Sequence, residues 1–205
     1  QNKTNKKFIY LISPNKILDI NFYDDLALVF SSKKISFFQL RLKKETNLNK
    51  LIIGKKIRKI CNKYKVKFLI NDDPLLAKKL NADGCHLGQK DMDLIKARKI
   101  LKNKIIGVTC HNSINLAKRA IKDGADYLAF GAFYATKTKT VKYRASLTVL
   151  KSIKKITSLP IVAIGGIKLN NYKKLLLNKA NFLAISGYIW NNKKYKPLEA
   201  IKKLK

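Results

Sequence analysis

Short apolar runs alternate with longer amphipathic segments from one end of this sequence to the other. The runs are rich in β-branched and aromatic residues, and they lie at 8–13, 37–42, 67–71, 84–88, 105–110, 127–133, 161–166 and 182–187. Such alternation is typical of parallel βαβ units, whose strands are buried on both faces. Eight units in 205 residues close most naturally into a (β/α)8 TIM barrel of class α/β. We therefore expect residues 1–205 to form a single TIM-barrel domain.

An open doubly wound sheet is the alternative architecture, but no GxGxxG motif follows the first strand. Helical periodicity between the strands supports the repeating unit. In the second helical segment the apolar residues are Leu48, Leu51, Ile52 and Ile60. Ser113 is expected to cap the fifth helix and Gly124 to end it.

In a TIM barrel the active site lies at the carboxyl ends of the strands, so polar residues at those ends are the candidates. Gln39, Arg41 and Lys43 alternate with apolar residues in the second run and are expected to share one face of that strand. Cations inside a barrel are costly unless an anion binds there. For Lys43 the alternative is a solvated start of the following loop.

Carboxylates follow the third and fourth strands. Asp72 and Asp91 are expected on the same rim, where two carboxylates can bind Mg²⁺ and leave positions for phosphate oxygens and water. Helix capping is the alternative, because Asp73 precedes Pro74 and Asp91 opens the fourth helix, which are both ordinary N-cap positions.

Glycines follow the seventh and eighth strands, as Gly165-Gly166 and Ser186-Gly187. In barrels these two loops commonly bind phosphate through backbone N–H groups. The sequence therefore predicts a phosphate site there.

Hydroxyl groups and a lysine follow the fifth and sixth strands. Thr109 ends the fifth strand, and the polar segment 135–145 carries Thr136, Thr138 and Lys139. We interpret this segment as a loop over the mouth of the barrel that closes on a phosphorylated ligand. His86 and His111 are each expected to be hydrogen-bonded or packed rather than catalytic.

The 45 Lys and Arg residues outnumber the 12 Asp and Glu residues, which gives a formal charge of +33. The lysines are spread over every predicted helix instead of forming one stripe, so we expect no specific nucleic-acid partner, and the positive potential favours anionic substrates. Three cysteines without ligand spacing argue against disulfides and structural zinc. No apolar run is long enough to cross a membrane and no cleavable leader is evident, so we expect a cytoplasmic protein without a membrane partner.

Seven motifs stand in order along the chain: QxRxK at 39–43, ND at 71–72, GxHxGQxD at 84–91, GVT ending at Thr109, TxTK at 136–139, IGGI around Gly165-Gly166, and IS at Ile185-Ser186. Together they resemble the thiamine phosphate synthase family over nearly the whole length. The resemblance implies a transferase that moves hydroxymethylpyrimidine from its diphosphate to hydroxyethylthiazole phosphate and releases pyrophosphate. Its partners would be these two small molecules, and a homo-oligomer is compatible with the sequence.

The resemblance also implies roles for single residues. Arg41, Lys43 and Lys139 would be catalytic and, with Asn71, would hold the pyrophosphate, while Asp72 and Asp91 would bind Mg²⁺ as the cofactor. Gln39 and Thr109 would hold the pyrimidine. Thr136 and Thr138 would lie near the thiazole phosphate, and the backbone of Gly166, Ile185 and Ser186 would contact the phosphate and the pyrimidine side.

The chain departs from the family pattern at two places. Thr109 replaces a usual serine and keeps the hydroxyl, whereas a usual glycine after TxTK is absent from 143–146. The missing glycine restricts the backbone where the thiazole phosphate would approach. Two other functions stay open at this point: a thiazole tautomerase of the same fold, which needs no diphosphate site, and a basic nucleic-acid-binding protein.

Overall fold

Eight parallel strands form a closed barrel in the computed structural model, which describes residues 7–136 and 142–205. Each strand pairs with its neighbours in sequence, and β8 closes the ring by pairing with β1. The strands are β1 (Ile9–Ile12), β2 (Ile35–Leu40), β3 (Lys67–Asn71), β4 (Gly84–Leu87), β5 (Ile105–Thr109), β6 (Tyr127–Phe130), β7 (Ile161–Ile164) and β8 (Phe182–Ile185). The predicted TIM barrel is confirmed.

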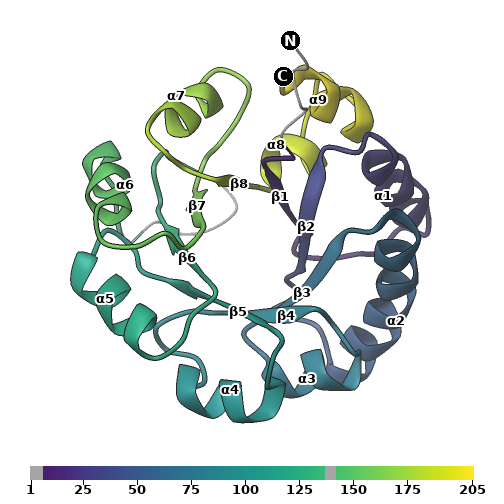
Figure 1. The fold of residues 1–205 in the computed structure, drawn as a ribbon. Helices are drawn as coiled ribbons and strands as arrows, with labels where there is room; N and C mark the ends of the chain where they lie inside the picture. The colour runs from purple at the N-terminus through teal and green to yellow at the C-terminus, as the bar shows by residue number, and fades with distance from the viewer. Residues whose placement is uncertain (1–6, 137–141) are drawn as a thin grey trace.

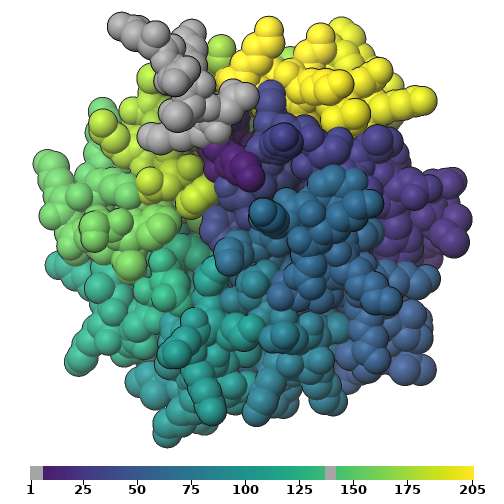
Figure 2. Space-filling view, turned by 45° about the vertical axis from the view of Figure 1, so that its right-hand side comes forward, coloured from purple at the N-terminus to yellow at the C-terminus, as the bar shows by residue number. Residues whose placement is uncertain are grey.

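Helices form a ring outside the strands (Figure 1). They are α1 (Asn21–Ser31), α2 (Asn47–Tyr64), α3 (Pro74–Lys79), α4 (Leu94–Leu101), α5 (Ile114–Lys122), α6 (Leu147–Lys154), α7 (Tyr172–Leu177), α8 (Gly187–Trp190) and α9 (Pro197–Lys203). The last helix, α9, packs against α1 and α8, so the first and last helices of the chain lie side by side (Figures 1 and 2). Among the described residues no helix is long and apolar enough to cross a membrane.

Two apolar clusters stabilise the barrel. The larger one fills the space between the strands and the helix ring, and it includes Phe38, Ile57 and Leu183. The smaller one lies inside the barrel and includes Tyr10, Leu69 and Tyr127. Because every strand contributes side chains to both faces, the strands are apolar almost throughout, which explains why they were visible in the sequence.

The helix signals in the sequence are partly confirmed. Ser113 caps α5 by accepting a hydrogen bond from the Leu116 amide at 3.2 Å, and Gly124 follows the helix with φ of 94°. The helix predicted from Leu48, Leu51, Ile52 and Ile60 is confirmed as α2; Leu48 and Ile52 are exposed on it, and its buried residues are Gly54, Ile57 and Cys61.

A recurring contact joins strands in pairs at the amino end of the barrel. The residue just before an even strand accepts a hydrogen bond from the backbone at the start of the preceding odd strand. Asp83 accepts from the Phe68 amide at 2.7 Å, Asp126 from Ile106 at 2.8 Å, and Asn181 from Ile161 at 2.9 Å. We call these three contacts the strand clips. Arg58 and Arg98 each bind a clip carboxylate at 2.7 Å, which neutralises its charge.

Candidate active site

The predicted site residues stand at or just after the carboxyl ends of their strands. Since all eight strands are parallel in one closed barrel, these ends form a single rim. Asn71, Thr109 and Ile185 are the last residues of β3, β5 and β8. Thr136 follows β6 among the described residues, whereas Thr138 and Lys139 lie outside them.

Strand β2 ends earlier than the sequence suggested. It stops at Leu40, so the expectation that Gln39, Arg41 and Lys43 share one strand face was wrong beyond Gln39. Arg41 and Lys43 belong to the turn that follows. The Arg41 amide donates to Ser13 Oγ at 2.9 Å, and this side-chain contact takes the place of a backbone hydrogen bond between strands.

The side chain of Arg41 is held near the rim by the loop after β1. Its Nη1 donates to Asn15 Oδ1 at 2.9 Å. Burial lowers the pKa of Arg41, and the charge of Asp72 opposes this shift. Asn15 and Ser13 were not identified from the sequence, because a Ser-Pro-Asn stretch after a strand reads as ordinary turn chemistry.

Asp72 lies at the centre of a cluster of charged groups. Its Oδ2 lies 3.1 Å from Lys43 Nζ, and its backbone has a positive φ of 65°. Asp tolerates this left-handed conformation better than most residues, and such conformations are frequent at functional sites. Lys43 is therefore half-exposed, as the loop alternative proposed, and also paired with Asp72.

The carboxyl groups of Asp72 and Asp91 interact directly, and their pKa values shift in opposite directions. Burial and the bond to Asp72 raise the pKa of Asp91. Burial also acts to raise the pKa of Asp72, but the hydrogen bond from Asp91 and the Lys43 ammonium outweigh it and lower that pKa. Two carboxyls this close to each other form a pair whose repulsion a cation can relieve.

The helix-capping alternative is correct for Asp73 and wrong for Asp91. Asp73 accepts from the Leu76 amide at 2.9 Å and caps α3. The cap of α4 is Asp93, which accepts from the Ile95 amide at 3.0 Å. Asp91 instead accepts from the Gly88 amide at 2.7 Å within the loop, which turns its carboxyl toward Asp72.

The donor set at this rim suits a cation with few protein ligands. Within the described residues no group of three or more His, Cys, Asp or Glu side chains could hold a metal ion. Asp72 and Asp91 supply two carboxylates. Mg²⁺ commonly takes one or two carboxylates and completes its shell with water and substrate phosphates, so the residues present fit this ion.

Gly165 and Gly166 are required by the close approach of two loops. Both have positive φ, 106° and 62°. A Cβ on Gly166 would lie 2.2 Å from the Ala135 carbonyl oxygen, and one on Gly165 would lie 2.3 Å from Ala132 Cβ. The paired glycines therefore let the segment after β6 pack on the segment after β7.

The segment without the usual glycine is tied to its surroundings. Ala132 and Tyr143 are joined by a backbone hydrogen bond of 3.0 Å, and Ala145 donates back to Ala132 at 2.9 Å. The Tyr143 ring stacks on His111 with centroids 4.0 Å apart, so His111 packs as expected.

At β8, Ile185 is buried. Ser186 Oγ donates to the Ser13 carbonyl oxygen at 3.1 Å and links the ends of β8 and β1. The short helix α8 begins at Gly187. Barrel enzymes often bind phosphate with the loops after strands seven and eight and with such an extra helix.

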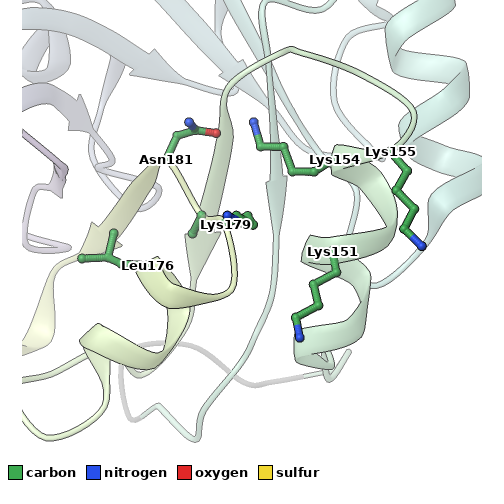
Figure 3. Close-up of a pocket in the computed structure, with 7 residues that line it drawn as sticks. Lys151, Lys154, Lys155, Leu176, Lys179 and Asn181 are labelled. Carbon is green, nitrogen blue, oxygen red and sulfur yellow. The ribbon is translucent and has the colours of Figure 1, made fainter.

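A surface pocket lies at the opposite end of the barrel. It has a volume of about 520 Å³, and its lysines Lys151, Lys154 and Lys155 extend from α6 toward solvent or the region before β8 (Figure 3). Asn181, which precedes β8, belongs both to this pocket and to a strand clip. Because the pocket lies at the amino ends of the strands, we assign it to the stabilising end of the barrel rather than to the site.

Comparison with known proteins gives one consistent family. The model of the thiamine monophosphate synthase family matches residues 9–189. The thiamine-phosphate synthase of Pelagibacter ubique (strain HTCC1062) is 95% identical over 205 residues, which cover 100% of this chain and 99% of the relative. That of Nitrosomonas eutropha (strain DSM 101675 / C91 / Nm57) is 38% identical, with 89% and 86% covered.

A solved structure leads to the same family. The thiamine phosphate pyrophosphorylase from Pyrococcus furiosus superposes with a TM-score of 0.83 at 26% identity, covering 98% of this chain and 95% of the other. The names of these relatives give no support to the tautomerase-like or nucleic-acid-binding alternatives. The chain belongs to the thiamine monophosphate synthase family.

Proposed function

We propose that this chain is the transferase that joins hydroxymethylpyrimidine, supplied as its diphosphate, to the nitrogen of hydroxyethylthiazole phosphate. The main support is the charged cluster around Asp72 on the rim, in a chain 95% identical to a relative named thiamine-phosphate synthase. We further propose that residues 1–205 act as one barrel domain in the cytoplasm, with these two small molecules as substrates.

The reaction separates charge and then recombines it. The bond between the pyrimidine methylene carbon and the diphosphate oxygen breaks, and its electron pair leaves with pyrophosphate. The ring-stabilised cation left behind is captured by the lone pair of the thiazole nitrogen, which forms the new carbon–nitrogen bond. The protein's task is therefore to stabilise the leaving group and to hold the two rings in line.

Arg41 and Lys43 would bind the leaving diphosphate, together with Asn71 and Lys139. Arg41 is suited to this because its guanidinium is oriented by Asn15 and partly desolvated, which strengthens its attraction to an anion. Lys43 would exchange part of its interaction with Asp72 for the diphosphate.

Asp72 and Asp91 would hold Mg²⁺. This ion supplies Lewis-acid neutralisation of the diphosphate charge when it is bound. A bound cation would also relieve the repulsion between the two carboxyls, each of which shifts the pKa of the other.

Gln39 and Thr109 would hold the pyrimidine ring. Gln39 is buried in the barrel, and Thr109 ends β5 on the rim. Phosphate of the thiazole substrate would bind across the loops after β6, β7 and β8, where we assign contacts to Thr136, Thr138, Gly166, Ile185 and Ser186.

An activity assay that follows product formation over time tests the proposal. Purified protein is mixed with the pyrimidine diphosphate, the thiazole phosphate and Mg²⁺, and we expect thiamine phosphate and pyrophosphate in equal amounts. Lys43→Ala should lower the rate strongly, while Lys44→Ala, which alters the adjacent exposed lysine, should leave it unchanged. Absence of both products with the unaltered protein would reject the synthase function.

A further inference from the structure

A continuous chain of hydrogen bonds crosses the interior of the barrel. Gln39 Nε2 donates to Tyr10 Oη, Tyr10 Oη contacts Tyr127 Oη, Tyr127 Oη contacts His86 Nδ1, and His86 Nε2 contacts Thr109 Oγ1. Each of the four distances is 2.7 Å. The five side chains come from β2, β1, β6, β4 and β5, and we call them the interior chain.

The interior of such a barrel is normally filled by branched apolar side chains. Here Tyr10 is 1% exposed, Gln39 and Tyr127 are each 3% exposed, and His86 is 8% exposed. Among the described residues every buried side-chain nitrogen and oxygen has a partner. A polar network whose interior atoms are all paired at this depth fixes one arrangement of its members, because each unpaired group there would be costly.

The hydrogen atoms of the interior chain can be assigned by counting donors. Burial raises the pKa of both Tyr10 and Tyr127, so both hydroxyls keep their protons. Tyr10 Oη accepts from Gln39 and therefore donates to Tyr127. Tyr127 in turn donates to His86 Nδ1.

The assignment determines the tautomer of His86. A neutral imidazole whose Nδ1 accepts a hydrogen bond carries its proton on Nε2. His86 Nε2 therefore donates to Thr109 Oγ1. Two groups at the ends of the chain are then left for a ligand: the Gln39 carbonyl Oε1 as an acceptor and the Thr109 hydroxyl hydrogen as a donor.

We propose that Tyr10, Tyr127 and His86 are positioning residues that fix the Nε2–H tautomer of His86 and thereby give Gln39 and Thr109 opposite hydrogen-bonding roles toward the pyrimidine. This inference rests on the proposed function, in which Gln39 and Thr109 hold that ring. A ring nitrogen accepts from Thr109, and an amino substituent donates to Gln39 Oε1. An analogue with a carbonyl in place of the amino group would oppose one acceptor with another and be rejected.

The reversed chain is the competing arrangement. If the Gln39 amide is flipped so that Oε1 faces Tyr10, every hydrogen bond of the interior chain runs in the opposite direction. His86 then carries its proton on Nδ1, and Thr109 donates to His86 instead of to a ligand. The two arrangements differ in a quantity that can be measured without substrate, namely which nitrogen of His86 is protonated.

Nitrogen NMR of ¹⁵N-histidine-labelled protein, free of ligand, reads this directly. The chain has only two histidines, and a His111→Gln variant assigns their signals. At a pH of about 8 we expect His86 in the Nε2–H form, because its Nδ1 accepts from Tyr127. An Nδ1–H form, an imidazolium, or a mixture of tautomers in the unaltered protein would each overturn the proposal.

A tyrosine variant tests the link to specificity. Tyr127→Phe removes the donor to Nδ1, so we expect a mixture of His86 tautomers and a roughly tenfold loss of discrimination in kcat/KM between the amino substrate and its carbonyl analogue. Tyr172→Phe is the matched control, because it removes another buried hydroxyl, bonded to the Lys205 carbonyl oxygen at 2.7 Å, outside the chain. It should change neither quantity.

The outcomes separate the positioning role of Tyr127 and its tautomer assignment from the proposed synthase function. A Tyr127→Phe protein with an unchanged tautomer and unchanged discrimination would contradict the positioning role. If that variant does not fold, the tautomer of the unaltered protein still decides the proposal. If the unaltered protein shows the Nε2–H tautomer but forms no thiamine phosphate, the proposed function fails while the hydrogen-bond assignment stands.

Discussion

Asp72 combines three constraints in one residue. It has a left-handed backbone, an ion pair with Lys43 at 3.1 Å, and a hydrogen bond with the carboxyl of Asp91. A backbone conformation of this kind costs about 1–3 kcal/mol, and a surrounding site must over-determine it. The residue is therefore placed by the rim and not by the preference of its own backbone.

Removal of the Asp72 carboxylate is expected to abolish Mg²⁺-dependent turnover. We expect Asp72→Ala to lower kcat/KM by at least about 100-fold, in the range of losing a preorganised electrostatic group. Asp72→Asn keeps a residue that tolerates positive φ, so it separates the loss of charge from backbone strain. Rates measured over a Mg²⁺ titration check this, and Asp24→Ala, on the exposed face of α1, is the control. Unchanged kinetics in Asp72→Asn would remove this residue from the site.

A comparison of Gly166 with Gly124 separates the cost of backbone strain from the cost of a steric clash. Both have positive φ, but a Cβ on Gly124 meets nothing within 4 Å, whereas one on Gly166 meets the Ala135 carbonyl oxygen at 2.2 Å. We expect each alanine variant to lose about 1–3 kcal/mol of unfolding free energy from strain. Only Gly166→Ala should also raise KM for the thiazole phosphate, because it displaces the loop after β6. Denaturant titration and steady-state kinetics measure the two effects, and equal activity in both variants would contradict a role for this loop contact.

At the scale of elements, the helix caps show how local sequence positions a helix. Ser113 and Ser146 both stand at N-cap positions, but only Ser113 accepts a hydrogen bond from the helix backbone. Ser146 Oγ is instead 2.6 Å from Thr148 Oγ1. A serine at the N-cap position is therefore expected to contribute more to the stability of α5 than to that of α6.

Alanine substitution of these two serines should separate their contributions. Ser113→Ala is expected to lower the unfolding free energy by about 1 kcal/mol, and Ser146→Ala by less than about 0.5 kcal/mol. Chemical denaturation with unchanged m-values measures the difference. Equal losses would show that capping by Ser113 adds nothing to α5.

Strand order and strand positions were predictable because each strand is a compact apolar run between polar segments. Strand ends were less so: β2 was predicted to reach Leu42, but the Arg41 amide bonds to the Ser13 hydroxyl and ends the ladder at Leu40. The helix α2 was predictable from its apolar period, but its buried face was not, because Leu48 and Ile52 are exposed and burial depends also on which neighbours cover a helix.

The rim residues were predictable because strand ends in a parallel barrel share an edge. The interior chain was predictable only in part: Gln39, His86 and Thr109 stood out as polar residues, whereas Tyr10 and Tyr127 look like ordinary core aromatics within apolar strands and are 117 residues apart. Their hydroxyl partners depend on barrel closure, which a single strand pattern does not contain.

At the scale of the whole molecule, positive charge is widely spread and little neutralised. The chain carries 45 Lys and Arg residues, and within residues 7–136 and 142–205 only four ion pairs form. A field of this kind attracts any polyanion without reading its sequence.

Binding to nucleic acid should therefore be weak and strongly dependent on salt. We expect dissociation constants on the order of 10⁻⁴–10⁻⁶ M for duplex DNA near physiological salt, without sequence preference. Fluorescence anisotropy with two unrelated duplexes across a salt series measures this. Tight binding that persists at high salt, or preference for one duplex, would restore the nucleic-acid-binding alternative.

The strand clips divide the barrel into coupled pairs, β3 with β4, β5 with β6, and β7 with β8. A break in the polypeptide near Asn103, between β4 and β5, leaves every pair intact, and Arg98 can still bind Asp126 across the gap. A break near Asp123 separates the two members of a pair. The molecule should thus reassemble from two complementary pieces when divided at the first position and fail to do so at the second, which makes its architecture modular in steps of two strands.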